Sequence, residues 1–174
     1  MDSSGVVAAV ALLVVLVVML AELRISKGNE ATLRASGAIE PPEDVYPTMQ
    51  WAYPAAFVVM ALEGAILGPV PGVATLAGAL LMGVSKALKY WAVASLGGRW
   101  TFRVLVVPGT SLVVHGPYAV VRHPNYIAVI GELVSMALLV GARVTGPVAV
   151  LLFSLMLRRR IRVENEALRH LTCS

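Results

Sequence analysis

The feature that most constrains the fold is an apolar run near the start of the chain, GVVAAVALLVVLVVMLAEL, residues 5–23. It is apolar on every side of a helix until Glu22, and Arg24 and Lys27 close it. A helix needs about 20 such residues to cross the hydrocarbon core of a bilayer. The rest of the chain is similar, because 58% of its 174 residues are apolar and only 14% are charged, with a mean hydropathy of +0.80. The sequence therefore predicts an all-α integral membrane protein.

The length allows about five membrane spans of roughly 20 residues each. We expect one domain over residues 1–174, with spans near 5–23, 51–68, 73–94, 125–140 and 144–157. The turns GPVPG (68–72) and GAR (141–143) are short, so each should join two antiparallel helices. These turns predict a compact bundle with no separate soluble domain.

Three segments outside the expected spans have patterns of their own. Residues 24–50 are polar and contain Pro41-Pro42, which predicts a connecting segment along the membrane surface. In residues 103–118, RVLVVPGTSLVVHGPY, two β-branched runs flank Pro108-Gly109, which predicts a short cytoplasmic hairpin. Residues 157–170 have no Gly or Pro, so they should continue the fifth span as a C-terminal cytoplasmic helix.

The distribution of positive charge predicts the orientation. If the N-terminus lies outside and the C-terminus in the cytoplasm, thirteen of the fourteen Lys and Arg residues fall on the inner side, and only Arg143 falls outside. This is the positive-inside pattern, and it predicts this orientation of the helices. The pI of 9.6 then reflects topology, so no nucleic-acid partner is needed. Cys173 is the single cysteine, which leaves no disulfide or cysteine metal cluster within one chain, and we expect no metal.

Besides Glu22, near the end of the first span, four charged residues fall inside the expected spans. Lys86 and Lys89 are interpreted as anchors whose stems extend to the interface. Glu63, in the outer half of the second span, should pair within the bundle, with a partner that the sequence does not identify. Glu132 lies about 10 Å below the start of the fourth span at 1.5 Å per residue. Two interpretations stay open for it: a functional acid, or a carboxyl group hydrogen-bonded to a neighbouring helix.

The motif RHPNY, residues 122–126, carries most of the polar chemistry. Pro124 is suited to the first turn of a helix, which places Arg122 and His123 just ahead of it. The helix N-terminus and Arg122 both attract an anionic group, and Tyr126 shares a side of the helix with His123. This predicts a site for a polar, partly aromatic cofactor with an anionic end. The alternative is a basic helix boundary alone, but the C-terminal segment with Glu164 should emerge beside the motif and favours a site.

Taken together, GPYAVVRHPNY (116–126), the helical hairpin and RIRVENEAL (160–168) resemble the isoprenylcysteine carboxyl methyltransferase family. Its members are integral membrane enzymes that use S-adenosylmethionine, and the resemblance covers roughly residues 76–170. The segment ISKGNEATLRASGAIEP (25–41) resembles a bacterial branch found with type III polyketide synthases, whose members O-methylate long-chain pyrones or resorcinols. This resemblance implies a location in a bacterial inner membrane.

The resemblance implies roles for individual residues. Arg160 would face the substrate. The cofactor site would consist of Ser111, Leu112, Val113, Tyr118, His123, Pro124, Asn125, Tyr126 and Glu164. Ala128 stands where many members have glycine, and Asn165 replaces the second acid of a Glu-Glu pair, which leaves open whether Glu166 shares that role.

We therefore expect an S-adenosylmethionine-dependent O-methyltransferase acting on a carboxylate, enol or phenol of a lipophilic substrate that enters from the membrane lipid. Arg160 and Glu132 are the expected catalytic residues. A carboxylate or acidic enol needs no strong base, whereas an ordinary phenol would need one, for which His115 and Glu132 are candidates. One alternative is an NAD(P)H-dependent membrane reductase of the steroid-reductase-like type, which shares the Arg-His-Pro-Asn-Tyr helix start. The other is a non-enzymatic membrane scaffold whose basic face binds anionic lipid. The sequence does not indicate an oligomeric state.

Overall fold

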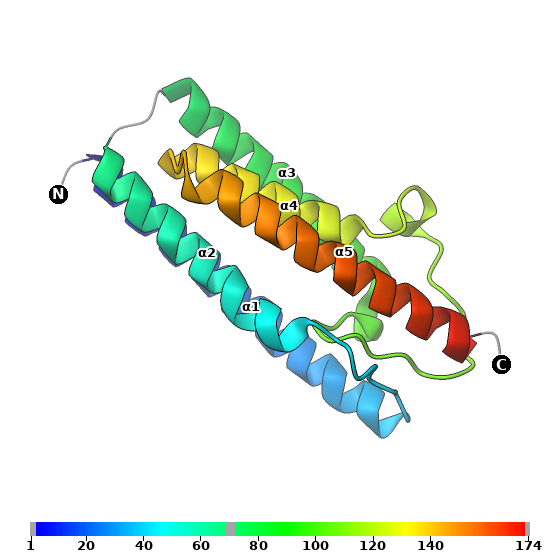
Figure 1. Cartoon of the computed structure of the whole chain (residues 1–174). Helices are drawn as coiled ribbons and strands as arrows, with labels where there is room; N and C mark the ends of the chain where they lie inside the picture. Colours follow the sequence, from blue (N-terminus) through cyan, green and yellow to red (C-terminus); the bar gives the residue numbers. More distant parts are fainter. Residues whose placement is uncertain (1–2, 69–71, 173–174) are drawn as a thin grey trace.

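The computed structural model describes residues 3–68 and 72–172. Its five long helices are α1 (Ser3–Ala35), α2 (Tyr46–Leu67), α3 (Gly72–Leu96), α4 (Pro124–Val140) and α5 (Thr145–Thr172). Two short 3-10 helices, η1 (Gly97–Arg99) and η2 (Gly116–Ala119), lie in the connection between α3 and α4. The long helices run side by side, and the two termini lie at opposite ends of the bundle (Figure 1). No β-strand forms within the described ranges, so the all-α prediction is confirmed.

The number of membrane spans is confirmed only in part. Three of the described helices are long and apolar enough to cross a membrane: Gly5–Ala35, Tyr46–Leu67 and Gly72–Arg99. Helix α4 is apolar but has only 17 residues, which is roughly 25 Å against a hydrocarbon core of about 30 Å. Helix α5 has 28 residues, but Arg158, Arg159 and Arg160 end its apolar half. The five helices are present, and two of them are short as membrane spans.

The first helix is longer than predicted. The sequence placed a surface segment after residue 23, but α1 continues to Ala35. Residues 24–35 contain no proline, and their inner side binds the α3–α4 connection. The Ser26 hydroxyl accepts a hydrogen bond from the Phe102 amide at 2.8 Å, and the Asn29 side chain donates to the Trp100 carbonyl at 2.8 Å. The polar residues of this stretch therefore face a protein surface that local sequence could not reveal.

The predicted cytoplasmic hairpin over residues 103–118 is wrong. Its turn exists, because Gly109 has a φ of 76° and Thr110 donates to the Val107 carbonyl at 3.3 Å. The flanking runs, however, do not pair with each other. Val106 instead forms an isolated antiparallel bridge with Ile39, and the Val104 amide donates to the Asp44 carboxylate at 2.9 Å. The connection after α1 supplies these backbone partners, so the segment is an ordered loop.

The helical boundaries around the RHPNY motif agree with the sequence. Helix α4 begins at Pro124, with His123 just before it in a non-helical conformation. It ends at Gly141, whose φ of 72° is left-handed, and α5 starts a few residues later and continues as one helix through the basic segment. Three residues of the predicted GPVPG turn, 69–71, lie outside the described residues.

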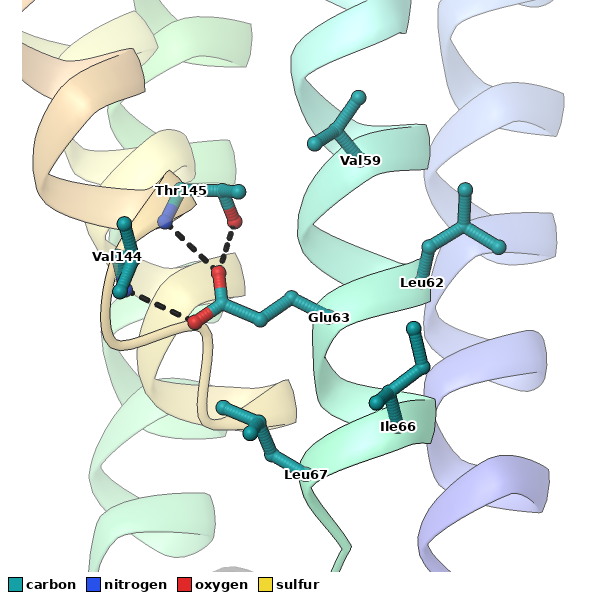
Figure 2. A pocket seen from close by; sticks show the side chains of 7 residues that line it. All are labelled: Val59, Leu62, Glu63, Ile66, Leu67, Val144 and Thr145. Atoms are coloured by element: carbon teal, nitrogen blue, oxygen red, sulfur yellow. Dashed lines mark hydrogen bonds between the residues drawn. The ribbon is translucent and has the colours of Figure 1, made fainter.

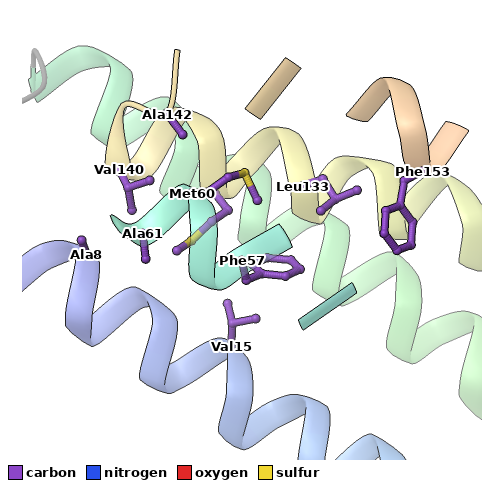
Figure 3. Close-up of a cluster of buried hydrophobic side chains, with 10 residues drawn as sticks. Ala8, Val15, Phe57, Met60, Ala61, Leu133, Val140, Ala142 and Phe153 are labelled. Carbon is purple, nitrogen blue, oxygen red and sulfur yellow. The ribbon is translucent and has the colours of Figure 1, made fainter. Parts of the chain in front are cut away.

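Apolar side chains and glycines hold the bundle together. Phe57 and Met60 of α2 are fully buried in a cluster with Val15, Leu133 and residues of α5 (Figure 3). Helices α3 and α4 pack closely, because a Cβ atom at Gly78 would lie 2.7 Å from the Leu139 amide nitrogen. Small residues allow this contact between membrane helices. The α3–α4 pair forms a firm support for the start of α4.

A cluster of charges is buried between α1, α2, α3 and α4. Lys89 is 1% exposed, and its Nζ lies 2.6 Å from Glu22 and 3.3 Å from Glu132. Lys86 lies 3.1 Å from Glu22 and 2.9 Å from Glu132. The Tyr53 hydroxyl also donates to Glu132 at 3.0 Å. The interpretation of both lysines as interfacial anchors is therefore wrong. These contacts agree with the interpretation of Glu132 as a carboxyl group hydrogen-bonded to neighbouring helices. Its expected catalytic role stays a prediction.

Glu63 now has identified partners. Its carboxylate accepts hydrogen bonds from the amides of Val144 at 2.9 Å and Thr145 at 2.7 Å, and from the Thr145 hydroxyl (Figure 2). These amides belong to the first turn of α5, where helical N–H groups lack intrahelical acceptors. Glu63 of α2 thus caps α5 across the bundle. The expectation that it pairs within the bundle is confirmed.

Candidate active site

The RHPNY motif forms a compact group at the start of α4. Pro124 lies in the first turn of the helix. The rings of His123 and Tyr126 stack, with centroids 5.3 Å apart and an angle of 19° between their planes. The predicted sharing of one helix side by these two residues is confirmed. The stack fixes the direction in which both polar side chains point.

The Tyr126 hydroxyl joins α4 to α5. It donates a hydrogen bond to Glu164 at 2.5 Å and accepts one from Arg160 Nε at 2.9 Å. His123 Nδ1 lies 3.8 Å from the same Glu164 oxygen. Four residues that the sequence singled out are therefore in contact, and their contacts use side chains from two helices. Tyr126 thus stands between Arg160 and Glu164 and contacts both.

Arg160 is held by more partners than the sequence suggested. Its Nη1 donates to Asp44 at 3.2 Å, and its Nη2 donates to the Phe102 carbonyl. The side chain is buried. Sequence reasoning missed both partners. Asp44 follows Pro41-Pro42 in a polar segment, and nothing in that local pattern indicates a contact with α5.

Asp44 organises the loops around Arg160. Besides Arg160, it accepts hydrogen bonds from the backbone amides of Val104 at 2.9 Å and Tyr46 at 3.0 Å. Several donors satisfy the hydrogen-bonding capacity of this buried carboxylate. The α1–α2 connection, the α3–α4 connection and α5 therefore meet at one ion pair behind the site.

Several polar groups at the site have no protein partner. His123 Nε2 and Asn125 Oδ1 are buried and have no hydrogen-bond partner among the described residues. Burial, and then the nearby charge of Glu164, raise the pKa of Tyr118, so its phenol stays protonated. Buried polar atoms are normally satisfied, so these groups fit a polar ligand with both donors and acceptors.

A pocket of about 410 Å³ lies between α4 and α5. Its polar end contains Arg122, His123, Tyr126 and Arg158. The remaining walls are Val121, Ile127, Ile130, Ser154, Leu157 and Ile161. The volume is in the lower part of the range of about 300–1,000 Å³ that is usual for small-molecule sites. The site therefore combines a polar cluster with an adjacent apolar groove.

Some residues that the sequence singled out lie elsewhere. Ser111 and Leu112 are exposed, and the Ser111 carbonyl accepts a hydrogen bond from Arg99 at 2.6 Å. His123, Tyr126, Arg160 and Glu164 are called the Tyr126 group below. No hydrogen bond or ion pair joins residues 111–113 to this group within the part of the chain that is described. Glu132 belongs to the buried charge cluster, and exposed His115 does not line the α4–α5 pocket. The cofactor and catalytic roles assigned to these residues stay predictions.

Among the described residues, no group of three or more His, Cys, Asp or Glu side chains lies close enough to hold a metal ion. Cys173 lies outside the described residues.

The fold and the site together define a class of protein: a membrane helix bundle with a polar side-chain cluster at one end, beside an apolar pocket. The model of the isoprenylcysteine carboxyl methyltransferase family matches residues 77–170. The chain belongs to this family of membrane methyltransferases. The matched region includes most of α3 and all of α4. It contains all four residues of the Tyr126 group, but not Asp44.

Two curated proteins are similar along most of the chain. An uncharacterized protein, YpbQ, from Bacillus subtilis is 35% identical over 148 residues, which cover 85% of this chain and 88% of that protein. An uncharacterized protein from Haemophilus influenzae is 25% identical over 158 residues, covering 90% of this chain and 92% of that protein. No solved structure matches significantly. The similarity to these relatives extends to α1 and α2, which the family match does not reach.

Proposed function

We propose that this chain is an S-adenosylmethionine-dependent methyltransferase that methylates an acidic oxygen of a lipophilic acceptor at the cytoplasmic interface. The observation that carries the proposal is the Tyr126 group, in which Glu164 is shared by Tyr126 and His123 beside an apolar pocket. A polar cofactor and an apolar acceptor need two such environments in contact. The family match supports methyl transfer.

The residues present fit the cofactor. Glu164 and Asn125 Oδ1 are acceptors suited to an ammonium group or ribose hydroxyls. The protonated phenol of Tyr118 and an imidazole N–H of His123 can donate. These four residues, with Pro124 and Tyr126, would hold S-adenosylmethionine. When bound, the cofactor supplies a methyl group on a positively charged sulfur.

The protein's own contribution is positioning. A carboxylate or acidic enol is already ionised near neutral pH, so no residue has to remove a proton from it. Glu132 and His115 are then not required as bases. Tyr126 keeps the Glu164 carboxylate at a fixed place by its 2.5 Å hydrogen bond. Holding two reactants in line accounts for much of the rate gain in such reactions.

The orientation with the N-terminus outside is part of the proposal. It is supported by the thirteen Lys and Arg residues that it places on one side. Arg122 and Arg158 of the candidate site are among them. A water-soluble cofactor would then reach the site directly from the cytoplasm.

The test is calorimetric titration of the purified protein in a neutral detergent. We expect saturable binding of S-adenosylmethionine but not of NADPH. His123→Ala should weaken that binding about ten-fold or more, because it removes a polar contact and the stacking partner of Tyr126. Arg159→Ala, on the exposed side of α5, is the control and should bind like the wild type.

Mass spectrometry of lipid extracts from cells with and without the protein should then reveal a species heavier by one methylene unit. Wild-type protein that binds NADPH instead would favour the reductase, and a protein that binds neither cofactor would favour the scaffold.

A further inference from the structure

We infer that Arg122 and Arg158, rather than Arg160, bind the negative charge of the acceptor, and that the acceptor's single apolar tail lies in the α4–α5 groove. The inference rests on the proposed function for the identity of the reaction, but the binding site itself is argued from the geometry alone. The acceptor would then be an anionic amphiphile with one apolar tail.

Each nitrogen of the Arg160 guanidinium already has a protein partner. Its Nε, Nη1 and Nη2 donate to Tyr126, Asp44 and Phe102 respectively. The residue is 5% exposed, and it does not line the α4–α5 pocket. If Arg160 moved away to reach a ligand, the buried Asp44 carboxylate would lose its positively charged partner. Such a loss is costly in a buried place. Arg160 is therefore a positioning residue.

Arg122 and Arg158 have the opposite character. Both are exposed and both line the polar end of the pocket. No hydrogen bond or ion pair joins either guanidinium to another residue in the described parts of the chain. A guanidinium binds carboxylate or phosphate through two parallel hydrogen bonds. Two unpaired guanidinium groups from different helices, at the mouth of one groove, are suited to a single anionic head group.

The rest of the groove is suited to an alkyl tail. Ile127 and Ile130 of α4 face Leu157 and Ile161 of α5. These residues recur three or four positions apart, so they form one continuous stripe on each helix. Ile127 is 53% exposed, so the groove is open along its side to the surroundings of the bundle. A tail can therefore enter from the bilayer while the charged head stays at the arginines.

The position of the groove also explains how the acceptor would meet the cofactor. On α5, Arg160 and Glu164 form a stripe next to the one that lines the groove. Tyr126 and His123 belong to both places, because they line the groove and also lie close to Glu164. The acceptor and the cofactor would thus both lie against these two rings, next to each other.

The test uses tetradecanoate as the probe and tetradecanol as a neutral molecule with the same tail. A reporter cysteine is placed in the groove by Ile130→Cys, in a Cys173→Ser background, and its rate of reaction with a maleimide is measured in a neutral detergent without S-adenosylmethionine. We expect tetradecanoate to slow the reaction at concentrations where tetradecanol does not. Arg122→Gln and Arg158→Gln should each raise the tetradecanoate concentration needed by about ten-fold or more.

The matched control is Arg159→Gln, which removes the same charge one residue away on the exposed side of α5 and should leave protection unchanged. Arg158→Lys, which keeps the charge but not the paired donors, should give an intermediate effect and replaces Arg158→Gln if that variant does not fold. Equal protection by tetradecanol, no protection by either molecule, or an equal loss in Arg159→Gln would each overturn the inference.

Calorimetry with S-adenosylmethionine separates this inference from the proposed function. Arg158→Gln should bind the cofactor like the wild type. If tetradecanoate protects the groove of a wild-type protein that does not bind S-adenosylmethionine, the anion site stands and the proposed function fails.

Discussion

At the scale of single residues, Tyr126 decides the geometry of the site. Its hydroxyl is a donor toward Glu164 and an acceptor from Arg160, residues that are 38 and 34 positions away in the sequence. A hydroxyl can do both at once, whereas an ammonium or guanidinium group can only donate. Tyr126 thereby separates two opposite charges on α5 and gives each of them a fixed place.

We expect Tyr126→Phe to keep the ring stack with His123 and to remove both hydrogen bonds. Hydrogen bonds to charged groups contribute about 1.5–3 kcal/mol each, so the variant should be less stable and should bind S-adenosylmethionine more weakly. Thermal unfolding in detergent and calorimetric titration measure the two effects. Tyr90→Phe, a change at a residue that is 46% exposed on α3, is the control. Unchanged cofactor affinity in Tyr126→Phe would show that the hydroxyl only joins the helices.

The sequence predicted part of this site because its spacing is local. His123 and Tyr126 lie three residues apart, and the short turn after α4 implies that the start of α4 meets the later part of α5. The partners of Arg160 follow no such rule. Asp44 is 116 residues away and Phe102 is 58 residues away, and both lie in connections whose path depends on the folded bundle. The contacts that hold Arg160 therefore could not be predicted from the sequence alone.

At the scale of helices and loops, local signals were sufficient where one residue sets a backbone boundary. Pro124 starts α4 and Gly141 ends it, as the sequence predicted. Local signals were not sufficient for the extension of α1 to Ala35 or for residues 103–118, where no hairpin forms. In both, a polar or β-branched segment is stabilised by a distant partner, such as Ile39 for Val106. Propensity alone does not contain that information.

The close packing of α3 on α4 gives the prediction at this scale. At Gly78 an added Cβ would lie 2.7 Å from the backbone nitrogen of Leu139 and 2.9 Å from the backbone oxygen of Ser135. Backbone atoms cannot rotate away as side-chain atoms can. Gly78→Ala should therefore push the two helices apart and lower the free energy of unfolding by about 1–3 kcal/mol. Gly83→Ala on the same helix meets nothing within 4 Å and serves as the control. Thermal unfolding of both variants in one detergent measures the difference. Equal stability of the two variants would contradict the close contact.

At the scale of the whole molecule, polar contacts attach α1 and α2 to the part of the chain that the family match covers. Glu22 of α1 and Tyr53 of α2 both reach the lysines or Glu132 of the buried charge cluster. Near the other end of α2, Glu63 caps the start of α5. The cluster contains two carboxylates and two ammonium groups, so it is neutral overall. Neutral pairing is what allows charges to remain inside an apolar bundle.

The last prediction concerns this cluster. Lys89 contacts both Glu22 and Glu132, so Lys89→Met leaves two buried carboxylates with only Lys86 between them. Loss of one partner from a buried pair costs about 3–5 kcal/mol, and we expect a loss of that order in the free energy of unfolding.

Adding Glu22→Gln should recover part of the loss, because one carboxylate and one ammonium group then remain, Glu132 and Lys86 at 2.9 Å. The double-mutant cycle of Glu22→Gln and Lys89→Met in detergent measures this coupling directly. Lys27→Met, on the exposed side of α1, controls for the loss of a charge and should change stability little. If the effects of Glu22→Gln and Lys89→Met simply add, the two residues act independently, and the attachment of α1 to α3 then depends on apolar packing instead of charge.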